Sequence, residues 1–240
     1  MSDQEKFTSQ TEDIKTSEGE QHLLKEDYLR QALENLQTTS RTAKGVVDIS
    51  ASADKAEKMA GDLTVEMAAK RALQNFANAI QYLYEHRQEQ FNDSQKLREF
   101  VEGVVKQINT GITKEGVLIR GGMDSAKFPY TKIADLESAM QQFYENLFQR
   151  LSDPAQDPKE IAAFIEYHID LVDHFFADGC GKAAKAISAW SLMQKNLSLP
   201  HYRSRDEYYA HARLQNPTGD STTDKQRQWE QWLTYYKTLF

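Results

Sequence analysis

A base, an acid and a glycine-rich turn follow one another in this chain, directly before an alanine-rich stretch. The base is His174 and the acid is Asp178, and two glycines, Gly179 and Gly181, flank Cys180. A helix N-terminus presents unpaired backbone N–H groups and the positive end of the helix dipole, and glycines let an anion approach the backbone closely. The stretch therefore predicts a phosphate-binding turn beside a proton acceptor.

Two lysines continue this pattern into the predicted helix. Lys182 and Lys185 lie three positions apart, so they share one helical face and both ammonium groups can point at the same anion. A lysine binds phosphate as a point charge, without the two-pronged grip of an arginine guanidinium. We expect the turn residues Gly179, Cys180 and Gly181 and the two lysines to hold the phosphates of a nucleotide.

The stretch resembles the signature of the Fic family, His-x-Phe-x-Asp-Gly-Asn-Gly-Arg-x-x-Arg. Cys180 stands where the family has Asn, and Lys182 and Lys185 stand where it has Arg. The positions that match by identity are His174, Phe176, Asp178, Gly179 and Gly181. The resemblance covers roughly residues 66–240, strongly at the signature and loosely elsewhere.

This resemblance implies a protein adenylyltransferase, which moves AMP or a related phosphate-containing group from a nucleotide to a hydroxyl side chain of a target protein. ATP is the expected donor, a Ser, Thr or Tyr hydroxyl the acceptor, and Mg²⁺ the cofactor. His174 would be the base that takes the hydroxyl proton, because imidazole titrates near neutrality. Asp178 would hold Mg²⁺, since this hard cation binds a carboxylate together with phosphate oxygens. Phe176 would anchor the loop in the core.

The β signal of the chain lies in the stretch 116–122, where apolar residues stand between glycines. The stretch is short, so a hairpin flap is expected rather than a larger sheet. By the family resemblance, a target segment adds to this flap as a strand through backbone hydrogen bonds. Arg120 taken alone is typical of a surface charge. The predicted target-binding residues are Val117, Leu118, Ile119 and Arg120.

Cys180 leaves two alternatives to an active transferase. The family's Asn supplies an amide donor near the phosphates, whereas a thiol donates only weakly, so the loss would cost on the order of 10²-fold or more in rate. The loss of this amide donor favours a catalytically weakened relative that binds a nucleotide or a partner. A cysteine at a helix N-terminus is also a candidate for a lowered thiol pKa, and with His174 as base it would make a thiol hydrolase. No orienting Asn or Asp stands at a known spacing.

The other polar and aromatic groups predict structural roles. His168, Asp170 and Asp173 precede the motif and are expected to be solvated, although Asp173 stands next to His174 and is a candidate for tuning it. Aromatic residues towards the C-terminus are expected to form core and rim packing. They are Tyr208, Tyr209, Trp229, Trp232, Tyr235, Tyr236 and Phe240.

Composition narrows the class of protein. The chain has 240 residues, enough for one large domain with an appendage, because domains commonly run to about 250 residues. Its net charge of −7 disfavours broad binding of nucleic acid. A single cysteine excludes an internal disulfide and fits a reducing compartment. No membrane span or conventional secretion signal is found, so we expect a cytoplasmic protein, with delivery into a host cell left open.

The predicted fold class is mostly α: a Fic-like helical bundle with a small β-hairpin flap. We predict a flexible tail over residues 1–21, an N-terminal helical extension over 22–65 and the Fic-like domain over 66–240. Ser94 is predicted to cap one helix, and Asp157 and Pro158 are predicted to be the N-cap and first residue of another. Apolar residues recur at helical spacing in 23–36, 52–61, 63–91, 94–108, 133–151 and 158–177.

Overall fold

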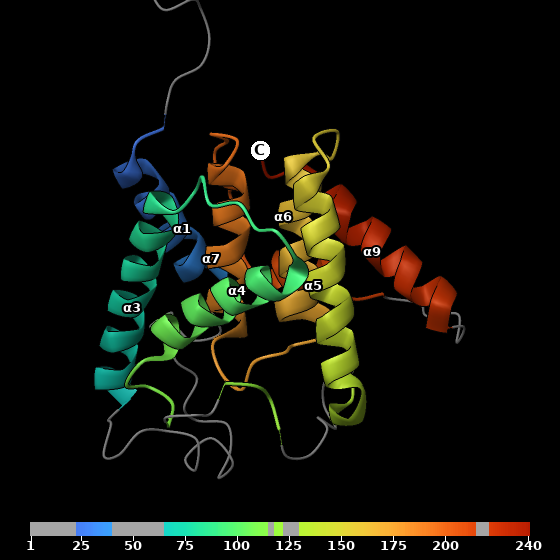
Figure 1. The fold of residues 1–240 in the computed structure, drawn as a ribbon, viewed down its shortest axis with the longest axis horizontal. Coiled ribbons are helices and arrows are strands. Elements are labelled where there is room, and N and C mark those ends of the chain that lie inside the picture. The colour runs from blue at the N-terminus through green and yellow to red at the C-terminus, as the bar shows by residue number, and fades with distance from the viewer. Residues whose placement is uncertain (1–22, 40–64, 115–117, 122–129, 215–220) are drawn as a thin grey trace, which may run out of the picture.

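A computed structural model describes residues 23–39, 65–114, 118–121, 130–214 and 221–240. This part of the chain is mostly α-helical, as predicted (Figure 1). The predicted tail over 1–21 and the predicted helix over 52–61 lie outside the described residues. The elements are α1 (Lys25–Thr39), α3 (Val65–Glu85), α4 (Ser94–Asn109), the 3₁₀ turn η1 (Ile133–Asp135), α5 (Leu136–Ser152), α6 (Pro158–Glu166), the π-helix η2 (Tyr167–Val172), α7 (Cys180–Met193), α8 (Arg205–His211) and α9 (Ser221–Lys237).

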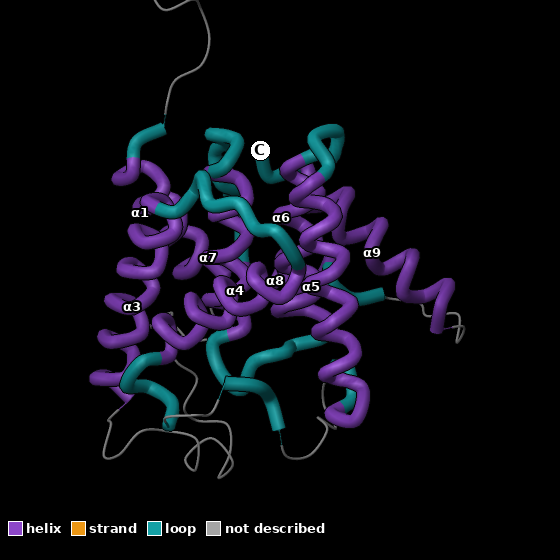
Figure 2. Tube along the Cα trace, viewed as in Figure 1, coloured by secondary structure: helices purple, strands orange, loops and turns teal. Residues whose placement is uncertain are grey.

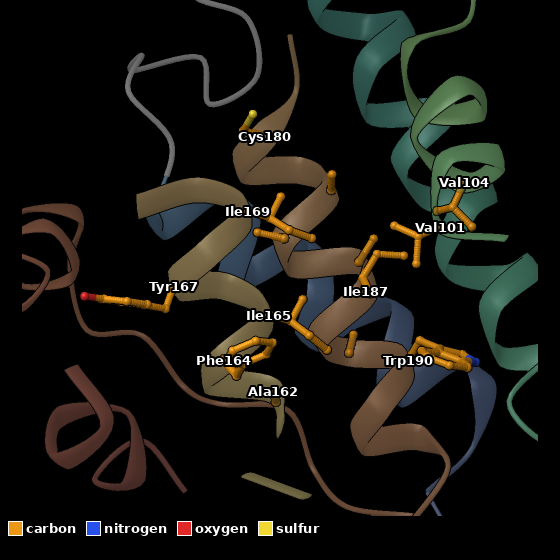
Figure 3. Packing of buried hydrophobic residues seen from close by; sticks show 14 of the residues in the cluster. Val101, Val104, Ala162, Phe164, Ile165, Tyr167, Ile169, Cys180, Ile187 and Trp190 are labelled. Atoms are coloured by element: carbon orange, nitrogen blue, oxygen red, sulfur yellow. The ribbon is translucent and has the colours of Figure 1, made fainter. Parts of the chain in front are cut away.

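Helix α7 lies at the centre of the bundle. It packs against α1, α3, α4 and α6, and every one of its residues except Gly181 is buried. Figure 2 shows helices around it and draws no strand among the described residues. Figure 3 shows Ile187 between Ile165 of α6 and Val101 of α4. The alanine-rich sequence of α7 suits this position, because small side chains let neighbouring helices approach closely.

Side chains cap the N-termini of three helices. Asp93 caps α4 by accepting from the backbone N–H of Lys96 at 2.8 Å. The prediction of Ser94 as that cap is wrong by one residue, since the extended backbone of Asp93 places its carboxylate over the first turn. Asp157 caps α6 with Pro158 as its first residue, which confirms both predictions. Ser204 caps α8.

The helix predicted over 158–177 changes character before the motif. Its α-helical part ends at Glu166, and the stretch Tyr167–Val172 is a π-helix, a wider turn that often occurs at functional sites. The backbone N–H groups of Asp173 and His174 both donate to the carbonyl of His168. His174 then takes a positive φ of 54°, which ends the helix and begins a loop that leads to α7.

The short β segment pairs with this loop. Ile119 and Phe176 form an isolated antiparallel bridge. The backbone N–H of Arg120 donates to the Phe175 carbonyl, and that of Ala177 donates to the Leu118 carbonyl, both at 2.9 Å. The described residues do not show the predicted hairpin, and Val117 lies outside them. What they show is that the flap segment is attached to the motif loop itself.

The N-terminal helix α1 belongs to the same core as the motif. Tyr28, Ala32 and Leu36 of α1 lie in one cluster of buried side chains with residues of α3 and α7.

Among the described helices, none is long and apolar enough to cross a membrane.

Candidate functional site

The predicted anion turn begins α7 without a capping side chain. Gly179 is the N-cap, in the left-handed region with φ 74° and ψ 17°, and its carbonyl accepts the first helical hydrogen bond from Ala183 at 2.8 Å. Within the described part of the chain, the backbone N–H groups of Cys180, Gly181 and Lys182 have no acceptor. These donors lie at the positive end of the helix dipole, which is the arrangement that binds anions.

Asn109 supports this turn from the last position of α4. Its side-chain Nδ2 donates to the main-chain carbonyl of Asp178 at 3.0 Å. Its Oδ1 lies 2.7 Å from the position that a Cβ on Gly179 would take. Asn109 is only 4% exposed, and its Oδ1 has no hydrogen-bond partner in the described structure. Residue 179 must therefore be glycine both for its backbone angle and for the space beside Asn109.

The structure brings Asp178 and Lys182 together at the turn. The ammonium of Lys182 lies 3.9 Å from the Asp178 carboxylate, and the lysine is 6% exposed. Its Cε lies 3.3 Å from the Cβ position on Gly179, so the lysine stem runs along the turn. This places one cation and one carboxylate beside the uncapped N–H groups.

The second motif lysine does not point at this turn, which corrects the expectation that both ammonium groups face one anion. Lys185 Nζ lies 2.6 Å from the Glu166 carboxylate of α6, and the two side chains are 3% and 1% exposed. The ammonium also lies over the ring of Tyr208, 3.8 Å from its centroid. A buried ammonium needs a counter-charge, and here Glu166 supplies it.

Cys180 faces the loop that precedes α7. Its Sγ lies 3.3 Å from both the backbone N–H and the carbonyl of Phe176, so the thiol can accept from one and donate to the other. Burial raises the thiol pKa well above its usual range, and the nearby Asp170 adds to this effect. The expected lowering of the pKa is therefore wrong, and the thiol-hydrolase alternative loses its nucleophile.

Two contacts hold the imidazole ring of His174, the predicted base. The ring stacks on Tyr130 with centroids 4.3 Å apart and planes 12° from parallel. Its Nδ1 lies 3.1 Å from the main-chain carbonyl of Asp170. Because a carbonyl only accepts, this contact assigns the proton of the neutral ring to Nδ1 and leaves Nε2 as the basic nitrogen.

Arg120 fixes the backbone around the predicted base, a contact pattern unlike that of a surface charge. Its Nε donates to the carbonyl of His174 at 2.9 Å, and its Nη2 donates to the carbonyl of Asp173 at 3.2 Å and to that of Thr131. The guanidinium can serve several carbonyls at once because it carries five donors in a fixed plane.

The acidic residues before the motif are buried, which corrects the expectation that they are solvated. Asp173 accepts from the Thr131 hydroxyl and lies 2.6 Å from Nδ1 of His168, so its carboxylate bonds to His168 rather than to His174. Asp170 accepts from the Tyr208 hydroxyl at 3.1 Å. Both carboxylates therefore bind neighbouring side chains inside the bundle and hold the loop before the motif in place.

The residues at the turn fit the expected Mg²⁺. This ion is commonly held by one or two carboxylates together with substrate phosphates and water. In the described part of the chain, no cluster of three or more His, Cys, Asp or Glu residues is placed to hold a metal ion alone. The partly exposed Asp178 carboxylate would therefore share the ion with phosphate oxygens of a ligand.

Comparison with known proteins supports the fold. The structure is similar to the crystal structure of a Fic domain containing signaling protein from Bacteroides thetaiotaomicron, with a TM-score of 0.57 and 11% sequence identity. The match covers 89% of this chain and 84% of that chain. No protein-family model matches the sequence. No curated protein matches it either.

Proposed function

We propose that this chain, which has the fold of a Fic-domain protein, transfers AMP or a related phosphate-containing group from a nucleotide to a hydroxyl of a target protein. The observation that carries the proposal is the uncapped start of α7. Its N–H groups lie beside Lys182 and Asp178, and the candidate base His174 lies on the loop that leads to this turn. The matching signature residues connect this arrangement with nucleotide transfer.

In the proposed reaction the hydroxyl oxygen of the target attacks the α-phosphorus of ATP. Its proton passes to Nε2 of His174, the nitrogen that lacks a proton because Nδ1 donates to the main-chain carbonyl of Asp170. The bond between the α-phosphorus and the bridging oxygen breaks, and pyrophosphate leaves with that electron pair. The target keeps AMP as a phosphodiester.

Charge on the phosphates is balanced by groups at the start of α7. The N–H groups of Cys180, Gly181 and Lys182 donate to phosphate oxygens, and the Lys182 ammonium adds a positive charge. Asp178 is the residue that would hold Mg²⁺, which when bound neutralises phosphate charge. Cys180 contributes its backbone N–H in this scheme, because its thiol is directed at Phe176.

A target segment would add to the flap on the edge away from the motif loop. Arg120 N–H and the Leu118 carbonyl are bonded to the loop. In an antiparallel ladder the N–H and carbonyl of the intervening residue, Ile119, point to the other edge. No described residue bonds to them, so they are available to an extended peptide.

A second candidate function is a binding module without efficient transfer. It is favoured by Lys185, which is committed to Glu166 and leaves Lys182 as the motif cation at the turn. In this case the chain binds a nucleotide and Mg²⁺ but does not modify a target.

Intact-mass measurement after incubation with Mg²⁺ and each nucleoside triphosphate separates the two functions. We expect the unmodified chain to gain the mass of one nucleoside monophosphate through self-modification, and His174→Ala to gain none. Mass addition by His174→Ala at the unmodified rate would contradict the role of the base. Nucleotide binding by calorimetry, without mass addition to the chain or to proteins of a lysate, would favour the binding module.

A further inference from the structure

A buried carboxylate, that of Glu166, gathers polar groups from several helices. Glu166 lies at the end of α6 and is fully buried. Its donors are Lys185 at 2.6 Å, Tyr202 at 2.7 Å, Ser188 at 2.8 Å, and Tyr208 and Tyr236 at 3.3 Å. Three tyrosines thus make the same kind of bond to one carboxylate.

Tyr208 differs from the other two tyrosines because it also reaches Asp170. Its hydroxyl lies 3.1 Å from Asp170 Oδ2 and 3.3 Å from Glu166 Oε2. Burial, followed by the charges of Asp170 and Glu166, raises the pKa of Tyr208 well above its usual range, so the hydroxyl keeps its single proton, which Asp170 and the slightly more distant Glu166 share. Within the described residues, it is the one hydrogen-bond donor to the Asp170 carboxylate.

Asp170 in turn contacts two parts of the candidate site. Its main-chain carbonyl accepts from Nδ1 of His174 at 3.1 Å. Its carboxylate oxygens lie 3.5 Å from the Cβ position on Gly181, so they pack against the first turn of α7. A shift of Asp170 would therefore move both the imidazole and the anion turn.

We infer that Tyr208 is a positioning residue for the transfer reaction, acting through Asp170 on His174 and on the first turn of α7. This inference rests on the proposed function for its effect on rate. The Tyr208 hydroxyl fixes the Asp170 carboxylate from α8, which stops the π-helix η2 from moving relative to α7. The tyrosine itself touches no reacting atom.

The chain offers matched variants for a test. Tyr208→Phe, Tyr202→Phe and Tyr236→Phe each remove one hydroxyl that bonds to Glu166, but only the first also frees Asp170. We expect Tyr208→Phe to lower kcat of transfer about tenfold with KM for the nucleotide changed less than twofold, since small misplacements of a reacting group are costly. Tyr202→Phe and Tyr236→Phe should keep kcat within about twofold. Thermal unfolding of all three variants shows whether each remains folded.

A second measurement does not depend on activity. In the ¹⁵N NMR spectrum of the neutral imidazole, the signals of His174 report which nitrogen carries the proton. We expect Tyr208→Phe to move these signals towards a mixture of tautomers, and the two control variants to leave them in place. An unmoved His174 signal in Tyr208→Phe, or equal losses of kcat in all three variants, would overturn the positioning role. Lack of transfer by the unmodified chain with any nucleotide would instead count against the proposed function, while the His174 signals would still decide the role of Tyr208.

Discussion

The first two turns of α7 satisfy their polar groups in opposite ways. Lys182 and Lys185 are almost equally buried, at 6% and 4% exposed, so burial does not distinguish them. Their partners do: Lys182 lies 3.9 Å from Asp178 at the turn, whereas Lys185 lies 2.6 Å from the buried Glu166. The Lys182 ammonium of the first turn lies next to backbone N–H groups that have no acceptor among the described residues. The Lys185 ammonium of the second turn is paired inside the core.

Three other described helices begin differently from α7. Asp93, Asp157 and Ser204 close the starts of α4, α6 and α8 with a side-chain acceptor. Such a cap is worth about 1 kcal/mol. Helix α7 has Gly179 in that position and no side-chain cap. Helix α5, which follows the 3₁₀ turn η1, also begins without a side-chain cap, so α7 is set apart by its left-handed glycine N-cap and by the Lys182 and Asp178 side chains beside it.

The largest expected effect concerns the second turn. Lys185→Met keeps the length of the side chain but leaves Glu166 buried without its counter-charge, so we expect a loss of about 3–5 kcal/mol in the free energy of unfolding. Chemical denaturation measures this loss in the free energy of unfolding. Glu166→Gln combined with Lys185→Met should recover part of the loss. Lys185→Met with unchanged stability and lost nucleotide binding would place this lysine back at the ligand.

The first turn should show the reverse pattern. Lys182→Met should weaken binding of ATP with Mg²⁺ by about 1.5–3 kcal/mol, the range for a hydrogen bond to a charged group, while costing less stability than Lys185→Met. Calorimetric titration gives the affinity, and denaturation of the same sample gives the stability. Unchanged affinity in Lys182→Met would remove this lysine from the proposed site.

A smaller effect tests the fit between Gly179 and α4. Gly179→Ala should cost about 1–3 kcal/mol in stability, because alanine is strained at φ 74° and its Cβ would meet Asn109 Oδ1. Asn109→Ala removes the contact but not the backbone strain. The double variant should therefore lose less than the sum of the two single losses in denaturation. Additive losses would mean that Asn109 does not restrict this position.

The smallest expected effect is a pH dependence from Cys180. Burial raises its pKa, so the folded chain keeps the thiol proton where an unfolded thiol, with a pKa of about 8.5, loses it. The contribution of this thiol to stability is complete below that pH and falls as pH rises, by at most about 1.4 kcal/mol per pH unit. Denaturation between about pH 8.5 and 9.5 should show a shallower decline for Cys180→Ala. Identical slopes would contradict a buried, protonated thiol.

The sequence predicted the parts of the site that depend on neighbouring residues. The two glycines and Asp178 set a turn that folds locally, and Asp157 followed by Pro158 begins a helix by the same kind of local rule. The helical stretches followed from apolar spacing. These features need only a few consecutive residues to form.

Such local patterns do not predict contacts between residues that are distant in the sequence. Asn109 reaches Asp178 across 69 positions, and Arg120 reaches His174 across 54. Lys185 was predicted to bind phosphate because its partner Glu166 lies on another helix. The sequence around Glu166 does not indicate which cation pairs with this carboxylate. The thiol pKa of Cys180 was misjudged for a related reason, since burial by the surrounding helices outweighs the local helix dipole.

The π-helix η2 also affects how the chain tolerates changes in length. A π turn holds about one residue more than an α turn, so η2 behaves like a single-residue insertion between α6 and the motif. Removing one residue from Tyr167–Val172 would let an ordinary α turn form, and the packing of α6 would be kept. The following loop, however, would be rotated by about 100° around the helix axis. One residue of chain length at this place therefore sets the direction in which His174 faces.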